Sequence, residues 1–213
     1  MTVERPPAVE ADVPYQRSRL LSSIIEIATT IGMAVVLYLV ITTFVVQTYQ
    51  VQQVSMLDTL QPNQHLLIDK LTPRFDDYSR GDIIVFHPPD TSEGDIPYIK
   101  RIIGVGGDHV EIHDGAVWVN GAKLDEPYVN PKYKIEPGDQ SSWDVPVGSL
   151  FVMGDHRNQS TDSRVFGTVP VSSVIGRAVV RIWPLDKIGI LQTPTYPNVP
   201  AAGSPATTAT AAP

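Results

Sequence analysis

Hydrophobic residues are distributed in three different ways along this 213-residue chain. Residues 27–46 form a run of twenty residues without a charge, and most of them are apolar. A helix rises about 1.5 Å per residue, so the run spans about 30 Å, the thickness of a bilayer core. The pattern predicts a transmembrane helix over residues 27–46, after a polar segment at 1–26. The alternatives are a buried core helix and a cleaved signal peptide, but the polar residues at 47–50 are poor cleavage sites.

The lysines and arginines predict the orientation of this helix. Arg5, Arg17 and Arg19 precede the apolar run, whereas no basic residue follows it before Lys70. Basic residues are retained on the cytoplasmic side of a membrane. We therefore expect a single-pass protein of the cell membrane, with a cytoplasmic N-terminus and with residues 47 onward on the outer face.

Residues 47–192 contain short apolar runs separated by turn signals, which is the pattern of a β-rich domain. The segment from Val110 to Gly121 alternates around Asp114-Gly115 and predicts a β-hairpin. No long segment with helical periodicity follows residue 46. We predict a mainly β fold with an antiparallel sheet. The expected strands lie at 66–68, 83–86, 98–105, 117–119, 150–153 and 174–183.

The last 21 residues, 193–213, have a different composition. They carry no charge and contain five prolines, six alanines and five threonines. Such a composition offers no continuous apolar face to pack. The segment is predicted to be a disordered tail.

Composition excludes several kinds of chemistry. The chain has no cysteine, so it has no disulfide, no thiolate metal site and no cysteine nucleophile. Its net charge of −7 argues against a nucleic-acid partner. His109 and His113 are four residues apart, but on a strand that spacing separates them by about 13 Å, too far for one metal ion. We expect no metal and no cofactor.

Three segments contain residues suited to catalysis. Ser55 follows the apolar run closely and needs a base to become a nucleophile. Lys100 lies within an apolar strand, where burial would favour its neutral form, although a solvated strand lysine is the alternative. The loop that begins at Gly154 is dense in paired charges, which either fix its shape or belong to an ordinary surface turn.

Together these segments resemble type I signal peptidase, also called leader peptidase. The matching features are the N-terminal span, Ser55-Met56, the segment Tyr98 to Gly104 with Gly107-Asp108 after it, and the Gly-Asp-x-Arg-x-x-Ser-x-Asp-Ser-Arg pattern at 154–164. Residues 80–86 also resemble a strand of that family, and the likeness covers about residues 40–183. It implies a mostly β serine–lysine protease that removes signal peptides from exported proteins.

The resemblance also implies roles for individual residues. Ser55 matches the nucleophile and Lys100 the general base, while Ser160 matches a serine that orients the lysine amine. Two pairs match structural ion pairs. They are Asp162 with Arg164, and Arg101 with Asp155.

The main departures from the family pattern surround the nucleophile. Gln53 stands where some members place a hydroxyl that helps bind the oxyanion, and its amide is a candidate donor beside the Ser55 backbone N–H. Val54 replaces a glycine, Asp58 replaces a proline, and His156 replaces the usual asparagine.

The sequence thus predicts a membrane-anchored signal peptidase whose partners are precursor proteins and the lipid bilayer. Substrates with small, Ala-x-Ala-like residues before the cut are implied by the resemblance. Two alternatives stay open. The first is a Ser-Lys peptidase dedicated to one or a few substrates, and the second is an inactive exported binding module of the same fold. Oligomeric state is not predicted.

Overall fold

The structure is a computed structural model, and it describes residues 13–74, 77–89, 96–135 and 141–203. The first twelve residues of the predicted cytoplasmic segment and residues 204–213 of the predicted tail lie outside these ranges. The chain divides into two compact units, residues 1–43 and 44–213.

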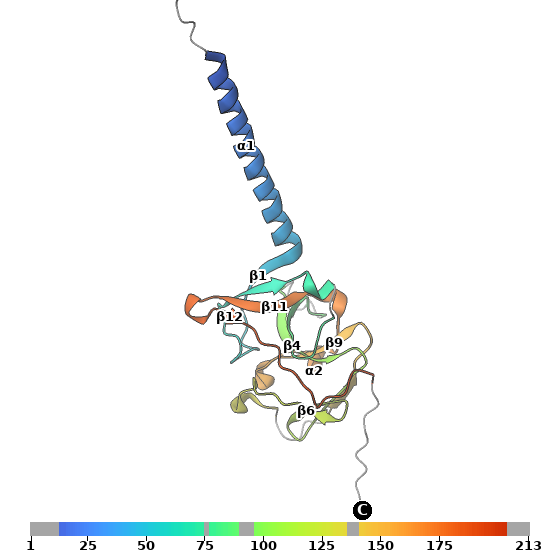
Figure 1. The fold of residues 1–213 in the computed structure, drawn as a ribbon. Coiled ribbons are helices and arrows are strands. Elements are labelled where there is room, and N and C mark those ends of the chain that lie inside the picture. Colours follow the sequence, from blue (N-terminus) through green and yellow to red (C-terminus); the bar gives the residue numbers. More distant parts are fainter. Residues whose placement is uncertain (1–12, 75–76, 90–95, 136–140, 204–213) are drawn as a thin grey trace, which may run out of the picture. The chain divides into compact units, whose positions relative to one another are not determined.

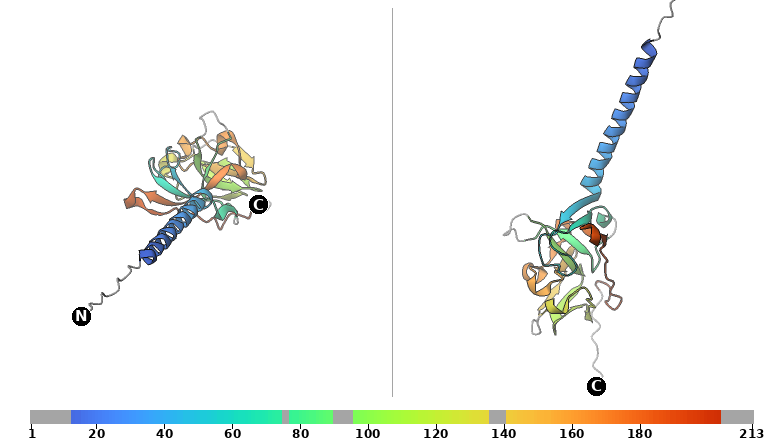
Figure 2. Two further views of the ribbon diagram at one scale, coloured as in Figure 1. Left: turned by 90° about the horizontal axis from the view of Figure 1, so that it is seen from above. Right: turned by 90° about the vertical axis from the view of Figure 1, so that its left-hand side faces the viewer.

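The first unit is built on one long helix, α1 (Val13–Val40), which leads into the short π-helical segment η1 (Ile41–Val45) (Figures 1 and 2). The stretch Leu21–Val45 is long and apolar enough to cross a membrane. Its start differs from the predicted residue 27, because Leu21, Ile24 and Ile25 extend the apolar surface and Glu26 is a single charge within it. The helical stretch ends at Val45, the last residue of η1, and Val46 begins a strand.

Threonines of α1 and η1 donate hydrogen bonds to backbone carbonyls one turn earlier in the same helical stretch. The Thr30 hydroxyl donates to the Glu26 carbonyl oxygen at 2.8 Å, and the Thr42 hydroxyl donates to the Tyr38 carbonyl oxygen at 2.9 Å. A hydroxyl that bonds within its own helix needs no water. The threonines therefore do not break the apolar character of the segment.

The second unit is mainly antiparallel β-structure, as the sequence predicted. One sheet runs in the order β1-β2-β11-β3-β4-β9-β10 with β12 added beside β11, and a second sheet runs β7-β6-β5-β8. The strands are β1 (Val46–Gln50), β2 (His65–Asp69), β3 (Ile83–Phe86), β4 (Tyr98–Val105), β5 (His109–His113), β6 (Ala116–Val119), β7 (Ala122–Lys123), β8 (Ser141–Asp144), β9 (Ser149–Met153), β10 (Val169–Pro170), β11 (Val174–Trp183) and β12 (Gly189–Ile190).

The helical turns of this unit are short. They are α2 (Ser163–Phe166) and the 3₁₀ turns η2 (Thr72–Arg74), η3 (Pro131–Tyr133), η4 (Arg157–Gln159), η5 (Val171–Ser173) and η6 (Leu185–Lys187). All six expected strands are present, and the hairpin at Asp114-Gly115 joins β5 to β6.

The strand β4 lies between β3 and β9, and it carries both expected functional residues of its segment. Lys100 pairs with Ile84 of β3, and Arg101 pairs with Met153 of β9. Successive side chains of a strand point to opposite faces of the sheet. The two basic side chains therefore leave β4 in opposite directions, into two different buried environments.

The prediction of a disordered tail is wrong for residues 193–203, which we call the C-terminal strap. Val199 is buried and Tyr196 packs beside it, both in the core formed by the second sheet with β4 and β9. The Thr193 hydroxyl donates to Asp82, and the Gly203 N–H donates to the Gly107 carbonyl. Composition missed this because two spaced apolar side chains and a few hydrogen bonds are enough to hold an extended strap.

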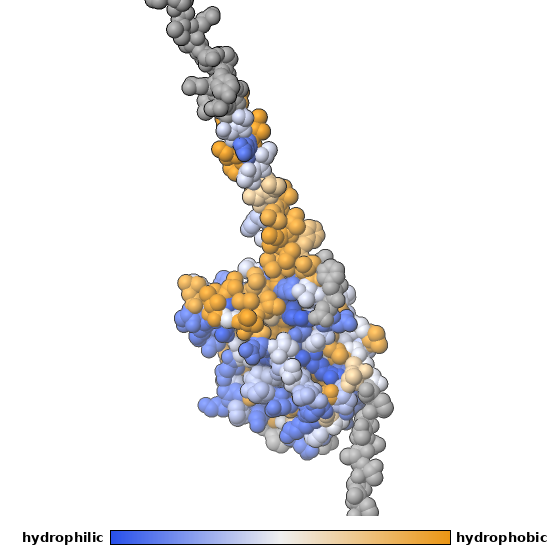
Figure 3. All heavy atoms as spheres, in the orientation of Figure 1, coloured by the Kyte–Doolittle hydropathy of each residue, from blue (hydrophilic) through white to orange (hydrophobic). Residues whose placement is uncertain are grey.

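Several apolar side chains remain exposed at the β11–β12 hairpin. Trp183, Leu185, Ile188 and Ile190 are between 49% and 79% exposed, and Figure 3 shows this end of the domain in orange. None of the four belongs to a buried core. The hairpin tip is therefore apolar surface rather than part of the packing.

Candidate active site

Ser55 lies in the loop between β1 and β2. The side chain of the neighbouring Met56 anchors this loop in the core. Met56 and Leu60 are fully buried in the core under β2 and β3. The Leu60 N–H donates to the Met56 carbonyl at 2.8 Å and closes a turn. The buried methionine side chain thus anchors the residue beside it, which faces the end of Lys100.

Ser55 and Lys100 meet directly. Lys100 Nζ lies 2.7 Å from Ser55 Oγ, a hydrogen-bond distance, although the two residues are 45 positions apart in the sequence. The side chain of Lys100 is buried, with 1% of the residue exposed, and the ring of Tyr98 lies 5.0 Å from Nζ. The solvated strand lysine considered from the sequence is therefore excluded.

A pocket opens in front of this pair. It has a volume of about 210 Å³ and is lined by Gln53, Val54, Ser55, Tyr98, Lys100, Gln159 and Thr161. Gln53 therefore lies on the same pocket as the serine and lysine. Among the hydrogen bonds of the described residues, none uses the backbone N–H of Ser55. That N–H is available to a ligand.

The loop after β9 holds the other side of Ser55. The His156 backbone N–H donates to the Ser55 carbonyl oxygen at 3.0 Å. Gly154 also packs against this oxygen and leaves no room for a side chain, because a Cβ added to it would stand 2.5 Å from the Ser55 carbonyl oxygen and 2.3 Å from Ser160 Oγ. Only glycine permits this approach. The loop and the segment around Ser55 are thus packed backbone against backbone.

Ser160 lies behind Gly154, but its hydroxyl does not contact the lysine. Ser160 Oγ is buried and makes no hydrogen bond to any described group. The expected hydrogen bond to the Lys100 amine is therefore not present in this conformation. A buried hydroxyl without a partner is uncommon in folded proteins.

Asp162 and Arg164 form a close ion pair at the end of the same loop. Arg164 Nε donates to Asp162 Oδ1 and Nη2 donates to Oδ2, both at 2.8 Å. Asp162 Oδ2 also accepts the Gly154 N–H at 3.0 Å, and Arg164 Nη2 donates to the Arg157 carbonyl at 2.6 Å. The pair therefore fixes the N–H side of Gly154.

Arg101 and Asp155 form a second bidentate pair, buried on the opposite face of β4. Arg101 Nε and Nη2 donate to the two carboxylate oxygens at 2.9 and 2.8 Å, and Thr59 Oγ1 donates to Asp155 at 2.6 Å. Burial lowers the pKa of Arg101, but the neighbouring Asp155 carboxylate outweighs it and raises the pKa above its ordinary value. Arg101 stays charged and holds Asp155 beside Gly154.

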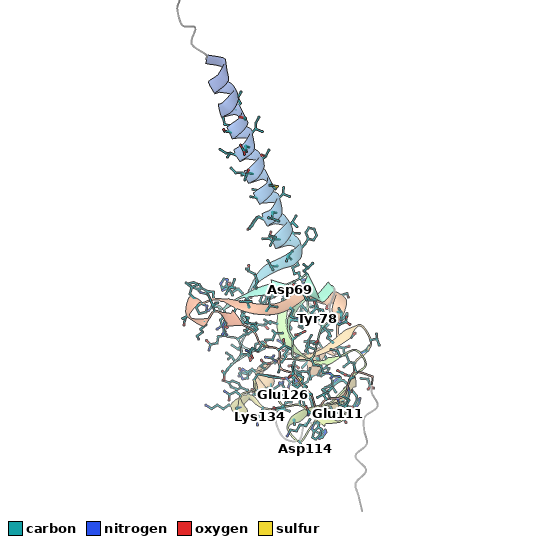
Figure 4. The ribbon with its side chains drawn as sticks, viewed as in Figure 1. Asp69, Tyr78, Glu111, Asp114, Glu126 and Lys134 are labelled. Carbon is teal, nitrogen blue, oxygen red and sulfur yellow. The ribbon has the colours of Figure 1, made fainter. Side chains whose placement is uncertain are left out.

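The structure adds a third pair that sequence reasoning missed. Arg157 donates to both carboxylate oxygens of Glu126, at 2.9 and 2.7 Å, and its Nε donates to the Gly154 carbonyl at 2.9 Å. Figure 4 labels Glu126, which lies after β7. The many charged residues of the loop drew attention to this segment in the sequence. No local pattern, however, paired Arg157 with Glu126, which lies 31 residues earlier.

The two histidines with helical spacing lie on strand β5, as expected. His109 Nδ1 lies 2.6 Å from Asp144 Oδ1, and His113 Nδ1 lies 3.0 Å from Asp114 Oδ2. Within the described ranges, no group of three His, Asp or Glu side chains is placed to hold a metal ion.

Comparison with known proteins adds independent information. The family model described as "Signal peptidase, peptidase S26" matches residues 24–183. This chain belongs to that family. It is 39% identical over 198 residues to a signal peptidase I of Leptolyngbya laminosa, a match that covers 91% of this chain and 95% of the relative.

Other relatives are similar. The chain is 41% identical over 172 residues to a probable signal peptidase I-2 of Synechocystis sp., which covers 78% of this chain and 77% of the relative. A crystal structure of a signal peptidase I from Enterococcus faecalis V583 is 33% identical, with a TM-score of 0.42, and covers 48% of this chain and 97% of that one.

Proposed function

We propose that this protein is a signal peptidase that cleaves exported precursors with Ser55 as nucleophile and Lys100 as general base. The observation that carries the proposal is the 2.7 Å approach of a buried lysine amine to a serine hydroxyl at the wall of a pocket. Membership of the signal peptidase family supplies the class of substrate.

The chemistry begins with a proton transfer. Burial penalises the charged ammonium of a lysine more than its neutral amine. The neutral Lys100 amine takes the Ser55 hydroxyl proton while Oγ forms a bond to the carbonyl carbon of the scissile peptide. The amine then returns that proton to the leaving nitrogen as the peptide C–N bond breaks, which is the role of a general base that becomes a general acid.

The second half of the reaction uses water. The acyl group remains bonded to Ser55 Oγ until Lys100 removes a proton from a water molecule that attacks the ester carbon. The bond from carbon to Oγ then breaks, and the proton returns to Ser55. Both tetrahedral intermediates carry an oxyanion, for which the free Ser55 backbone N–H and the Gln53 amide are the proposed donors.

The surrounding loop supports this geometry. Asp162 and Arg157 bind the two backbone polar groups of Gly154, and Arg101 holds Asp155 next to it. We infer that this fixes the backbone of Ser55 before substrate arrives. Ser160 is proposed to orient the amine once its hydroxyl rotates toward Lys100, since it is buried without another partner.

The apolar helix is proposed to anchor the enzyme in the cell membrane with a cytoplasmic N-terminus and an exported catalytic domain. A precursor is held in the same membrane by its own apolar segment. Confining both partners to one membrane raises their effective concentration.

The test is cleavage of a panel of exported precursors by the detergent-solubilised full chain, with Ser55→Ala as control. Cleavage of many precursors by the wild type, and of none by Ser55→Ala, is expected. Cleavage of one precursor alone would favour a dedicated peptidase. Binding of precursors without cleavage would contradict the proposed peptidase activity and would favour a binding module.

A further inference from the structure

The C-terminal strap contacts Tyr128, which lies between β7 and η3. Its Tyr196 side chain packs against the core, and its hydroxyl lies 2.9 Å from the hydroxyl of Tyr128. Tyr128 in turn places its ring 3.9 Å from the Arg101 guanidinium. The strap therefore adds a tyrosine to a cluster that already contains one of the site's ion pairs.

The directions of the hydrogen bonds follow from the number of protons. The Tyr128 hydroxyl has one hydrogen, which it donates to Glu126 Oε1 at 3.0 Å. In the contact between the two tyrosines, Tyr128 is then the acceptor and Tyr196 the donor. The same Glu126 oxygen also accepts from Arg157, so both donors fix the carboxylate that Arg157 binds.

The chain of contacts ends on the nucleophile segment. Arg157 Nε donates to the Gly154 carbonyl, and Gly154 lies against the Ser55 carbonyl oxygen. We propose that Tyr196 and Tyr128 are positioning residues, which act in series through Glu126 and Arg157 to hold Gly154 against Ser55. This inference rests on the proposed function, because it assigns these tyrosines to the same reaction.

The hydrogen-bond donors in this series of contacts keep the protons that they donate. Burial raises the pKa of Tyr196 to about 12, and burial followed by the Glu126 carboxylate raises the pKa of Tyr128 well above its ordinary value. For Arg157, burial lowers the pKa, but the Glu126 carboxylate outweighs it and the pKa lies above its ordinary value. The hydroxyls and the guanidinium remain donors across neutral and mildly alkaline pH.

Two other hydrogen bonds of the strap end on residues outside the loop after β9, and they provide matched controls. The Thr193 hydroxyl donates to Asp82 at 2.9 Å, and the Asn198 amide donates to the Lys123 carbonyl at 3.0 Å. Thr193→Val removes a strap hydrogen bond with almost no change of shape. It tests whether the loss of any strap hydrogen bond is enough to lower kcat.

The experiment measures kcat, KM and thermal unfolding for Tyr128→Phe, Tyr196→Phe, the double variant and Thr193→Val, beside the wild type and Ser55→Ala. We expect each tyrosine variant to lower kcat about tenfold, because small displacements of reacting groups are costly, with little change in KM. The double variant should be no slower than Tyr128→Phe, since residues in series are not additive. Thr193→Val should keep the wild-type kcat.

Three results would overturn the inference. They are unchanged kcat in both single variants, multiplied losses in the double variant, and an equal loss in Thr193→Val. Hydrogen exchange of the His156 amide, which donates to Ser55, gives a readout without catalysis. It should become faster in both tyrosine variants and not in Thr193→Val, and equal rates in all proteins would reject the coupling. If the wild type does not cleave, or Ser55→Ala does, the proposed function fails, while the exchange rates still decide the coupling.

Discussion

Gly154 stands so close to Ser55 that a Cβ at Gly154 would lie 2.5 Å from the Ser55 carbonyl oxygen. Real Cβ atoms do not approach a backbone oxygen so closely, and a backbone group cannot rotate away as a long side chain can. The loop after β9 therefore constrains where the segment around Ser55 lies.

Gly154→Ala is expected to move the two backbones apart. Overpacking of this kind costs about 1–3 kcal/mol of stability. A misplacement of reacting groups by about 1 Å costs about 100-fold in rate. Cleavage kinetics and urea unfolding check both effects. Gly189→Ala is the matched control, because a Cβ there meets nothing within 4 Å. Equal kinetics for the two variants would show that the close approach does not matter.

Gln53→Ala is expected to lower kcat by about 10²–10³ while KM changes little. The reason is that an oxyanion donor acts on charge that exists mainly in the transition state. Gln53 lines the pocket beside Ser55 and Lys100, whereas the neighbouring Gln52 is exposed and does not line it. Kinetics on one precursor peptide provide the measurement, with Gln52→Ala as control. An unchanged turnover rate for Gln53→Ala rules out the donor role.

Truncation after Gln192 is expected to destabilise the domain. It removes Val199 from a core, and burial of a valine alone contributes about 1.5–3 kcal/mol. It also removes the Pro200 carbonyl that accepts from Arg80 at 3.0 Å. Truncation after Gly203 keeps these contacts and should unfold like the full chain. Identical urea midpoints for the two truncated proteins would show that the strap contributes nothing.

Stability should fall in strong alkali because two partly buried tyrosines, Tyr78 and Tyr196, must ionise. The pKa of Tyr196 and of Tyr78 is raised to about 12, mainly by burial, from an ordinary value of 10.0. A raised pKa favours the neutral form in the folded state, so its contribution is complete below pH 10 and is lost as the pH rises toward 12. Urea unfolding and tyrosinate absorbance across this range check it. All tyrosines titrating together near pH 10 in the folded protein would contradict it.

Much of the fold followed from the sequence because its signals are local. Strands β3, β4 and β11 were predicted at their exact boundaries, since segments rich in valine, isoleucine and aromatic residues lie between turn residues there. Strand β1 was missed because Val46–Gln50 is polar and joins the sheet only by pairing with β2. Pairing with a distant segment produces no clear pattern in the sequence of a single strand.

Some residues of the candidate site could likewise be predicted from local sequence, and others could not. Ser55, Lys100 and the pair Asp162–Arg164 follow from motifs that carry the family resemblance. The bond from Arg157 to Glu126 and the contact of Tyr196 with Tyr128 join segments separated by 31 and 68 residues. Such contacts depend on the tertiary packing, so neither composition nor spacing could predict them.

The central claim is that Lys100 serves as the base for Ser55, and the turnover of Lys100→Met on a single precursor tests it most directly. Methionine keeps the length and apolar stem of the side chain but cannot accept the serine proton. The account predicts that folded Lys100→Met loses as much activity as Ser55→Ala, and that the double variant loses no more, because the two residues act as one unit. A Lys100→Met variant with wild-type unfolding behaviour and a near wild-type turnover rate would contradict it.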